Sequence, residues 1–352
     1  MRGVGCSTGA EPRAGRVGRL HAGRIRLGLG LALLLAAIPT CHAAAPANSP
    51  DLPFPTAPVR LVVPFPPGGV TGQLAQTLAQ RLSAQWAAEV RVEHWTGDAG
   101  NRGVAAFAKK PADGNWMLLA ASHVLVNPLL QPGVGYNMPR DFTAVTNIVT
   151  TPHAIAVRSS HGAKTLAELV AAVKARPGQL RYASPGVGST SNLTCQLLES
   201  AAGLVWQHVP EEGGGPAVKA VLEDRSDIIC MPLSPLLAPA NAGHLRLLAV
   251  TGYLRSRAVP NVPTAIESGY PSIVTDLMQG LFVPVGTPPA TVSRIHASVR
   301  QAMTGAATRQ DLEKDGHVLV LDSPTQFDFY VKTEIGRWRR LLQPSAAGGP
   351  KQ

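Results

Sequence analysis

This chain of 352 residues is predicted to be an α/β protein in which helices cover parallel β-sheets. Two observations predict this class. From Asp51 onward, short aliphatic runs alternate with segments whose apolar residues recur at helical spacing, which is the pattern of successive β–α units. In addition, two of the aliphatic runs open directly into glycine-rich turns that precede helical segments.

The first 45 residues have the composition of an export signal. An arginine-bearing stretch precedes the apolar run 27–38, and the small residues 43–45 offer a cleavage site. The run is about a dozen residues long, too short to span a bilayer comfortably, so cleaved secretion into the periplasm is predicted. Cys41 follows a sequence that loosely resembles a lipid-attachment box, but Pro39 fits that box poorly, and lipid anchoring is the minority alternative.

The net charge gives little support to nucleic-acid binding. Six Arg and one Glu in residues 1–45 account for +5 of the net charge of +10, which leaves +5 on the mature chain. This surplus is spread out, with no basic run and no basic stripe interleaved with aromatic residues. Charged side chains spread over a solvated surface account for this surplus of positive charge.

The first block of β–α units extends to residue 121. Its predicted strands are residues 59–64, 90–92 and 116–121. The turn at 65–71 opens a predicted helix whose apolar face has one residue every four positions: Leu74, Leu78, Leu82 and Trp86. Glycine-containing loops are expected at 96–103 and 111–114.

A second block begins near Pro152. Its predicted strands are residues 154–157, 180–183, 206–209, 228–230 and 245–250. A helix is predicted over 166–175 because Thr165 and Glu168 have the spacing of a capping box, and Thr264 with Glu267 repeats that spacing. The second glycine-rich turn, residues 184–191, follows the strand at 180–183 and precedes another helical segment.

The segment 280–284 and three helical stretches close the chain. The helical stretches are residues 290–303, 308–314 and 324–342. Their apolar stripes need a partner surface, and the sheet of the first block is expected to provide it. The tail 345–352 has two glycines and a proline and is expected to be disordered.

Two cysteines, Cys195 and Cys230, remain after removal of the export signal. In an oxidising compartment they could form a disulfide. However, Cys195 lies in a helix-like run and Cys230 in an apolar strand-like run, where buried free thiols are common. The sequence therefore slightly favours free thiols.

The two glycine turns are candidates for an anion site. The first four N–H groups of a helix have no internal acceptor, and the helix dipole adds roughly half a positive charge there. Glycines let the backbone approach a ligand, and hydroxyl groups add uncharged donors. A single turn of this kind is more often a tight turn with nothing bound, whereas two copies favour a site for one small carboxylate.

Five segments in order form a further pattern: VRLVVPFPPGG at 59–69, PADG at 111–114, KARPGQL at 174–180, AGHLR at 242–246 and GTPP at 286–289. Taken together, they resemble the Bug family of extracytoplasmic solute receptors of tripartite tricarboxylate transporters, also called TctC-like proteins. The resemblance covers the chain from about residue 58 to residue 342.

This resemblance implies the periplasmic-binding-protein fold: two α/β lobes, a hinge of two crossing strands, and a ligand cleft between the lobes. The first lobe would comprise residues 46–151 and 253–352, and the second residues 152–252. The implied ligand-binding residues lie in the two turns: Pro66, Gly68, Gly69 and Thr71 in the first, and Ser184, Gly186, Gly188, Ser189 and Thr190 in the second. Asn101 and Asn127 are further candidates, each equally suited to stabilising its own loop.

The chain departs from the family pattern at three places: Gly72 replaces an Asp, Glu211 and Glu212 replace a Tyr-Lys pair, and residues 230–232 replace Phe-Asp-Asn, which puts Met231 at the Asp position. A glutamate close to a bound carboxylate would repel it by about 1 kcal/mol or more. The glutamates either face solvent, which is the preferred alternative, or pair with the ammonium of an amino-acid-like ligand, or mark a receptor for uncharged or cationic solutes. We expect a ligand other than the ordinary dicarboxylate of the family.

The predicted function is that of a periplasmic solute-binding protein, which captures a small organic acid or related solute for a tripartite tricarboxylate-type transporter. A ligand sensor that signals to a membrane receptor and a diverged member with a non-carboxylate ligand are the alternatives. Expected partners are the small ligand, organic acid or amino-acid-like, and integral-membrane transporter subunits; no nucleic acid is expected, and the protein is expected to be a monomer. Closure of the lobes would bring backbone amides near Gly69 and Gly188 to the ligand.

An enzyme is not expected. The sequence has no Gly-x-Ser-x-Gly elbow, no His-Glu-x-x-His, no paired Cys-x-x-Cys and no phosphate-loop Gly-Lys-Ser/Thr. Histidines such as His123, His153 and His208 are scattered, and such residues are more often hydrogen-bonded core or surface groups than ligands. No catalytic residue, cofactor or metal is therefore predicted.

Overall fold

A computed structural model describes residues 54–342 of the chain. The predicted export signal, Cys41 and the tail 345–352 lie outside the described residues. Within the described range, no helix is long and apolar enough to cross a membrane.

The described strands form one mixed β-sheet in the order β2-β1-β3-β9-β4-β7-β5-β6, with β8 and β10 also paired to β4. The strands are β1 (Val59–Val63), β2 (Val90–His94), β3 (Trp116–Ala121), β4 (Phe142–Arg158), β5 (Arg181–Ser184), β6 (Gln207–Pro210), β7 (Ile228–Pro232), β8 (Leu245–Val250), β9 (Asp276–Pro284) and β10 (Val318–Leu319). The groups β2-β1-β3 and β6-β5-β7 are parallel, as predicted. The strands between them, β9 and β4, are antiparallel to their neighbours.

The helices follow the predicted alternation with the strands. They are α1 (Val70–Trp86), the 3-10 helix η1 (Asp98–Gly100), α2 (Asn101–Phe107), α3 (His123–Leu130), α4 (Met138–Asp141), α5 (Leu166–Ala175), α6 (Thr190–Ala202), α7 (Gly214–Leu222), α8 (Ser234–Asn241), α9 (Pro289–Met303), α10 (Ala306–Lys314) and α11 (Pro324–Leu342). The bounds of β3, β8, α5 and α11 agree with the sequence prediction residue for residue.

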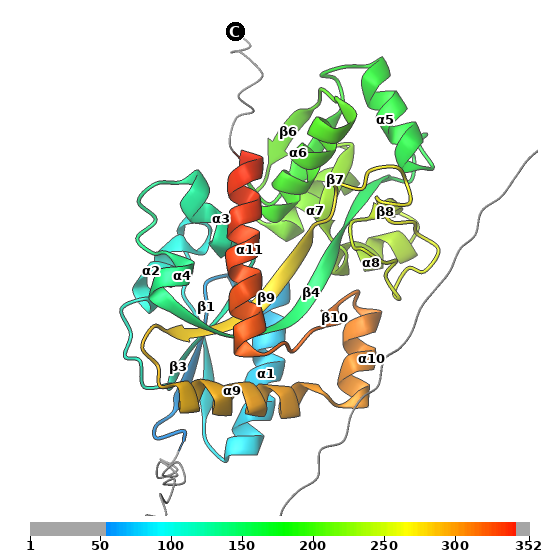
Figure 1. Ribbon diagram of the computed structural model, residues 1–352. Helices are drawn as coiled ribbons and strands as arrows, with labels where there is room; N and C mark the ends of the chain where they lie inside the picture. The colour runs from blue at the N-terminus through cyan, green and yellow to red at the C-terminus, as the bar shows by residue number, and fades with distance from the viewer. Residues whose placement is uncertain (1–53, 343–352) are drawn as a thin grey trace, which may run out of the picture. The chain divides into compact units, whose positions relative to one another are not determined.

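Strand β4 joins the two parallel groups. Its residues 142–152 pair with β9, and its residues 153–158 pair with β7 and β8. Figure 1 shows β4 and β9 running side by side through the middle of the fold. The sequence predicted only residues 154–157 of this strand, because β4 is buried on both faces and lacks the alternation that marks a half-exposed strand.

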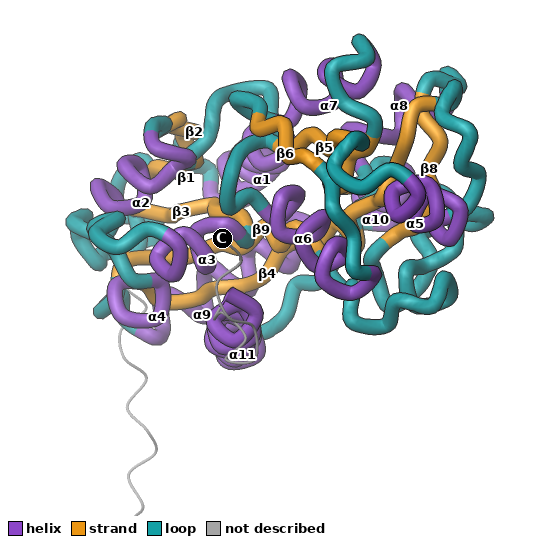
Figure 2. Tube along the Cα trace, turned by 90° about the horizontal axis from the view of Figure 1, so that it is seen from above, coloured by secondary structure: helices purple, strands orange, loops and turns teal. Residues whose placement is uncertain are grey.

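Helices cover both faces of the part of the sheet that contains β1, β3 and β9. On one face α1 and α9 bury Leu78 and Ile295, and on the other α2 and α11 bury Phe107 and Phe327. Figure 1 shows α9 crossing α1, and Figure 2 shows α4 and α11 next to β4. The prediction that the C-terminal helices pack on the sheet of the first block is confirmed. Burial of each leucine in these cores stabilises the fold by about 1.5–3 kcal/mol.

A second pair of cores surrounds β5, β7 and β8. Helices α5 and α6 bury Leu169 and Leu198 on one face, and α7 and α8 bury Val221 and Leu236 on the other. Ala265 and Ile273, which follow β8 in the chain, pack in the first of these cores. The lobe boundaries at 151/152 and 252/253 remain a prediction.

Both predicted capping pairs form hydrogen bonds, but only Thr264 and Glu267 form the reciprocal pair of a capping box. Thr165 Oγ1 accepts from Glu168 N at 3.2 Å at the start of α5, and Glu168 Oε2 accepts from Lys164 N at 2.7 Å. Thr264 and Glu267 exchange reciprocal bonds of 3.0 and 2.7 Å, but they open a turn that continues into no helix.

The expectation of free thiols is wrong, because Cys195 and Cys230 form a disulfide with a Cα–Cα distance of 5.7 Å. Cys195 lies on α6 and Cys230 on β7, and both side chains are fully buried in the core between these elements. Packing of the helix on the strand brings the two sulfur atoms together, and this contact was not visible from their local sequences.

Candidate functional site

The first glycine turn leaves the N-terminus of α1 open. Gly69 is the N-cap residue with extended backbone (φ −74°, ψ 165°), no side chain caps the helix, and its first turn contains no acidic residue. The first intrahelical bond runs from Gln73 N to Gly69 O, so the preceding amides have no acceptor within the helix. Pro66, Gly68 and Gly69 are exposed. An external acceptor can therefore reach this helix end.

Thr71 is the buried member of this turn and is held by strand β9. Its Oγ1 atom accepts from Gln279 Nε2 at 3.3 Å, and Gln279 is fully buried. The other amide atom, Gln279 Oε1, is buried without a partner among the described residues. If the amide is turned by 180°, Oε1 accepts from the Thr71 hydroxyl and the NH₂ group becomes the unpaired one. Gln279 was missed in the sequence, where a glutamine in the apolar strand 276–284 was the available signal.

Two histidines lie beside the first turn. Phe65 packs on the ring of His123 with a centroid distance of 4.4 Å, and burial lowers the pKa of His123 to about 4, so this imidazole is neutral at pH 7. His94 Nδ1 bonds Phe65 O at 2.7 Å. A Cβ atom at Gly72 would lie 3.2 Å from the His94 ring. With glycine here, no carboxylate competes for the helix N-terminus.

The hydroxyl groups of the second glycine turn already form hydrogen bonds within the protein. Ser184 Oγ contacts His208 Nε2 at 2.7 Å and Gly186 O at 3.0 Å. Ser189 Oγ caps α6 by accepting from Asn192 N at 3.2 Å, and it donates to Gly186 O at 2.7 Å. The hydroxyl groups predicted to meet a ligand are thus engaged within their own turn.

The Gly188 amide is also engaged, because it donates to Asn192 Oδ1 at 3.1 Å. A ligand would have to displace Asn192 to reach it. Gly188 has φ +76°, and a Cβ atom there would lie 2.6 Å from Leu130 Cδ1, at the end of α3. The positive φ angle therefore favours glycine at this position, and a larger residue would also have to displace the end of the Leu130 side chain.

Thr190, the last predicted residue of the second turn, bonds a histidine on β4. His153 Nε2 and Thr190 Oγ1 are 3.0 Å apart and both side chains are buried. Burial lowers the pKa of His153 to about 3, so the ring is neutral, and its Nδ1 atom has no partner among the described residues. His153 therefore anchors α6 to β4 as a buried, hydrogen-bonded histidine.

The two turns are anchored on neighbouring strands. Gln279 of β9 lies opposite Val149 of β4, and His153 lies four residues farther along β4. At about 3.3 Å per residue, the two anchor residues are separated by about 13 Å along the strand direction. In this region β4 stops pairing with β9 and begins to pair with β7 and β8.

The residues that depart from the family pattern are accommodated locally. Glu211 pairs with Arg225, and Glu212 is exposed, in agreement with the preferred solvent-facing alternative for the latter. Met231 is buried in the core beneath α7 and α8. Glu211 thus has its counter-charge within the protein.

Asn101 and Asn127 stabilise their own region. Asn101 Oδ1 accepts from Asn127 Nδ2 at 2.8 Å and from Tyr136 Oη at 3.0 Å, and Asn101 Nδ2 donates to Gln131 Oε1 at 3.0 Å. This network joins α2 to α3 and the following loop. The sequence left open whether these asparagines contact a ligand or stabilise their own loops. The hydrogen bonds described here are of the stabilising kind.

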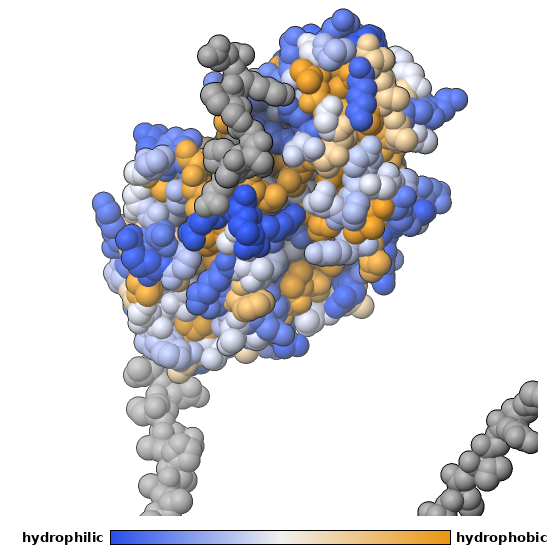
Figure 3. All heavy atoms as spheres, turned by 45° about the horizontal axis from the view of Figure 1, so that its top comes forward, coloured by the Kyte–Doolittle hydropathy of each residue, from blue (hydrophilic) through white to orange (hydrophobic). Residues whose placement is uncertain are grey.

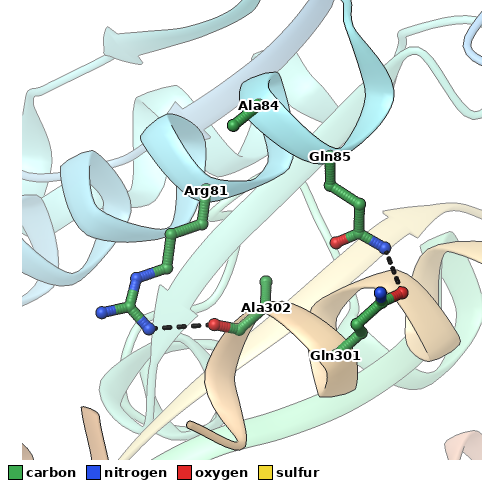
Figure 4. Close-up of a pocket in the computed structure, with 5 residues that line it drawn as sticks. All are labelled: Arg81, Ala84, Gln85, Gln301 and Ala302. Carbon is green, nitrogen blue, oxygen red and sulfur yellow. Dashed lines mark hydrogen bonds between the residues drawn. The ribbon is translucent and has the colours of Figure 1, made fainter. Parts of the chain in front are cut away.

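Two described pockets lie away from the glycine turns. One lies between α1 and α9, where Arg81 donates to Ala302 O at 2.9 Å and Gln85 donates to Gln301 Oε1 at 2.8 Å (Figure 4). Those polar groups bond one another across the helix interface. The second pocket lies beside α5. Within residues 54–342 no cluster of three or more His, Cys, Asp or Glu side chains could hold a metal ion.

The face shown in Figure 3 carries hydrophilic and apolar residues side by side. Large apolar side chains that are exposed include Val187, at 74%, and Phe329, at 72%. Scattered exposure of this kind is ordinary for a protein surface.

Comparisons with known proteins agree on one family. The model of the tripartite tricarboxylate transporter family receptor matches residues 74–346. Protein BugT of Bordetella pertussis is 31% identical over 321 residues, covering 90% of this chain and 97% of that protein. The solved structure of R. palustris Rpa4515 with adipate is 30% identical with a TM-score of 0.78, covering 82% of this chain and 97% of that one. The periplasmic binding protein BugD is 27% identical with a TM-score of 0.74, covering 82% and 98%.

Proposed function

The chain belongs to the tripartite tricarboxylate transporter receptor family, and from this membership we propose that it captures a small dicarboxylate in the periplasm for a membrane transporter. The family and the two-lobe periplasmic-binding fold expected from the five sequence segments are confirmed. Cleavage of the first 45 residues, action as a monomer and delivery to integral-membrane subunits are parts of the proposal.

The observation that carries the proposal is the open N-terminus of α1. Its unpaired amides, together with the dipole of a 17-residue helix, favour an anion at Gly69. The exposed turn residues Pro66, Gly68 and Gly69 admit the ligand, and Thr71 and Gln279 supply uncharged polar groups at its buried side. One carboxylate of the solute would bind here.

The second turn is proposed to complete the site on closure of the lobes. Ser184, Gly186, Gly188, Ser189 and Thr190 would then serve as a preformed wall, since their polar groups are already paired within the protein. Rigidity of this kind lowers the entropic cost of ligand binding.

The proposed ligand class is a dicarboxylate after all. The expectation of an unusual ligand rested on the charge of Glu211 and Glu212, and in the structure Arg225 balances Glu211 while Glu212 faces solvent. The adipate bound to the R. palustris relative supports the same class.

Isothermal titration calorimetry of the mature protein tests this proposal. The panel should contain adipate, succinate and malate, with glutamate, adipamide and putrescine as zwitterionic, neutral and cationic comparisons. At least one dicarboxylate should bind with a Kd of about 1 μM or lower. Binding confined to the neutral or cationic solutes would overturn the proposal.

A further inference from the structure

Three chain segments meet at one point of the sheet, which we call the junction. It consists of His153 on β4, Thr251 directly after β8 and Thr275 directly before β9. Their main chains form a closed ring of hydrogen bonds: Thr251 N donates to His153 O at 2.9 Å, Thr275 N to Thr251 O at 3.2 Å, and His153 N to Thr275 O at 3.4 Å. At the same place β4 stops pairing with β9 and begins to pair with β7 and β8. The ring therefore ties the ends of β8 and β9 to β4.

The junction is also bonded to helix α6, which begins at the second glycine turn. Thr194 Oγ1 lies 2.9 Å from Thr275 Oγ1, which in turn lies 3.1 Å from Thr251 Oγ1. One turn earlier on α6, Thr190 Oγ1 lies 3.0 Å from His153 Nε2. All five side chains are buried. Two contacts thus connect the beginning of α6 to the junction.

The hydroxyl groups of Thr194, Thr275 and Thr251 form a chain that has fewer hydrogens than contacts. At one end, Thr194 Oγ1 is also 2.7 Å from Thr190 O. At the other end, Thr251 Oγ1 is 2.6 Å from Thr275 O and 3.1 Å from His153 O. A hydroxyl group donates one hydrogen, so three hydrogens serve five contacts. The chain therefore has more than one way of arranging its hydrogen bonds.

Two arrangements leave every hydroxyl hydrogen with an acceptor. In the first, Thr194 donates to Thr275, Thr275 donates to Thr251, and Thr251 donates to a main-chain carbonyl. In the second, Thr194 donates to Thr190 O and Thr275 donates to Thr194, while Thr251 keeps its carbonyl. The hydroxyl groups only rotate between the two, and no buried donor loses its partner.

We propose that the junction is the pivot of lobe closure and that its hydroxyl chain makes Thr194, Thr251 and Thr275 positioning residues for the second glycine turn. This inference rests on the proposed capture of a solute by closure of the lobes. The predicted lobe boundaries, 151/152 and 252/253, lie within two residues of His153 and Thr251. Movement of the lobes changes distances at such a boundary, and a chain with two arrangements follows the movement while it keeps α6 bonded to β9.

Thr275→Val tests the middle of the chain. Valine has nearly the shape of threonine but no hydroxyl group, so it breaks the link between α6 and the junction strands. The other two hydroxyl groups keep acceptors, since Thr194 can donate to Thr190 O and Thr251 to the main-chain carbonyl of residue 275. The fold should therefore survive. Thr275→Ser restores the hydroxyl group and is the rescue variant.

Thr287→Val is the matched control for stability. Thr287 is also buried, and its hydroxyl group donates to Pro284 O at 2.8 Å, at the opposite end of β9 from the junction. Each valine substitution removes hydrogen bonding from a buried threonine and should lower the melting temperature by about 2 °C. A role in stability alone would give both variants the same ligand affinity as the parent protein.

Calorimetry with adipate, succinate and malate separates positioning from stability. Thr275→Val should weaken the binding of each solute that the parent protein binds by about tenfold, the size of one lost hydrogen bond. The affinities of Thr275→Ser and Thr287→Val should stay within about threefold of the parent value. An unchanged affinity in Thr275→Val, or an equal loss in Thr275→Ser or Thr287→Val, would overturn the inference.

Hydrogen exchange of the ligand-free protein decides the case in which none of the three solutes binds, an outcome that refutes the proposed function but not the coupling. Thr275→Val should speed exchange of the Thr251 amide, in the junction, and of the Leu193 amide, in the first turn of α6, by about tenfold each. Thr287→Val should leave both rates unchanged. No change at either amide, or a change at only one, would show that the chain does not couple α6 to the junction.

Discussion

Both glycine turns join a strand to a helix, but the backbone donors of the first are accessible to a ligand and those of the second are not. In the first, Gly69 begins α1 without a side-chain cap and the turn is exposed. In the second, Ser189 caps α6, Asn192 holds the Gly188 amide, and Ser184, Gly188 and Thr190 are buried. A glycine-rich strand-to-helix turn therefore does not by itself offer donors to a ligand. The donors are available to a ligand only where no nearby side chain already accepts hydrogen bonds from them.

The largest expected difference concerns the covalent link behind the second turn. The Cys195–Cys230 disulfide ties α6 to β7 across 35 residues, and no disulfide restrains α1. Replacing both cysteines with alanine should lower the free energy of unfolding by about 3–4 kcal/mol, the value for a loop of this length. Urea denaturation followed by circular dichroism measures this loss. An equal stability of the two proteins would show that packing alone holds α6 on β7.

The next largest effect is expected at the first turn. Gly69→Asp should reduce dicarboxylate affinity by about 100-fold, which corresponds to about 2.7 kcal/mol, because the new carboxylate caps α1 and repels the ligand. A Cβ atom at Gly69 meets only Pro66 O at 3.8 Å, so the fold should tolerate the change. Calorimetry with the tightest dicarboxylate measures the loss.

Gly69→Asn is the matched control, since it offers a similar cap without the charge. Its affinity should fall by less than about tenfold, and both variants should be more stable than the parent protein by a few tenths of a kcal/mol. Equal losses of affinity in Asp and Asn variants would mean that blocking the amides, and not charge repulsion, is responsible.

The strands that anchor the two turns should respond to pH in opposite directions. Burial, with a smaller contribution from Glu334, raises the pKa of Asp276 at the start of β9 to about 6. Its stabilising contribution is complete below pH 3.8 and is lost as pH rises through 6. Burial lowers the pKa of His153 on β4 to about 3, so its contribution is complete above pH 6.5 and is lost as pH falls toward 3.

Asp276→Asn isolates the first of these effects. The amide keeps an acceptor for Tyr330, which lies 3.2 Å from Asp276 Oδ1, and removes the ionisation. The variant should be about 2 kcal/mol more stable at pH 8, with little change at pH 4. The melting temperatures of both proteins should be measured from pH 4 to pH 8. If the difference between them is the same at every pH, the assignment of this effect to Asp276 is wrong.

The smallest effect is expected for Ser189→Ala. Loss of the N-cap should destabilise α6 by about 1 kcal/mol. Dicarboxylate affinity should change less than threefold if the second turn is a preformed wall. A loss of tenfold or more, measured by calorimetry, would instead indicate that the Ser189 hydroxyl leaves its cap to bind the ligand.

Local sequence was sufficient for the elements whose signals are local. The capping residues Thr165 and Glu168 and the breaker Pro177 defined α5, and the four-residue apolar spacing from Leu74 to Trp86 defined the face of α1. Ordered motifs over most of the chain identified the family and, with it, the fold. Strand β4 beyond residues 154–157 and helix α3 were missed, since uninterrupted burial and an internal Pro128 hide their periodicity.

For this protein, the sequence alone determined the alternation of strands and helices, the family, and the two glycine turns, because propensity, capping and motif order depend on residues close together in the chain. Only the tertiary structure decided that Cys195 meets Cys230, that Gln279 holds Thr71, and that Asn192 occupies the Gly188 amide. The first two of these contacts join residues far apart in sequence, and all three depend on side-chain geometry, which no pattern of residue types encodes.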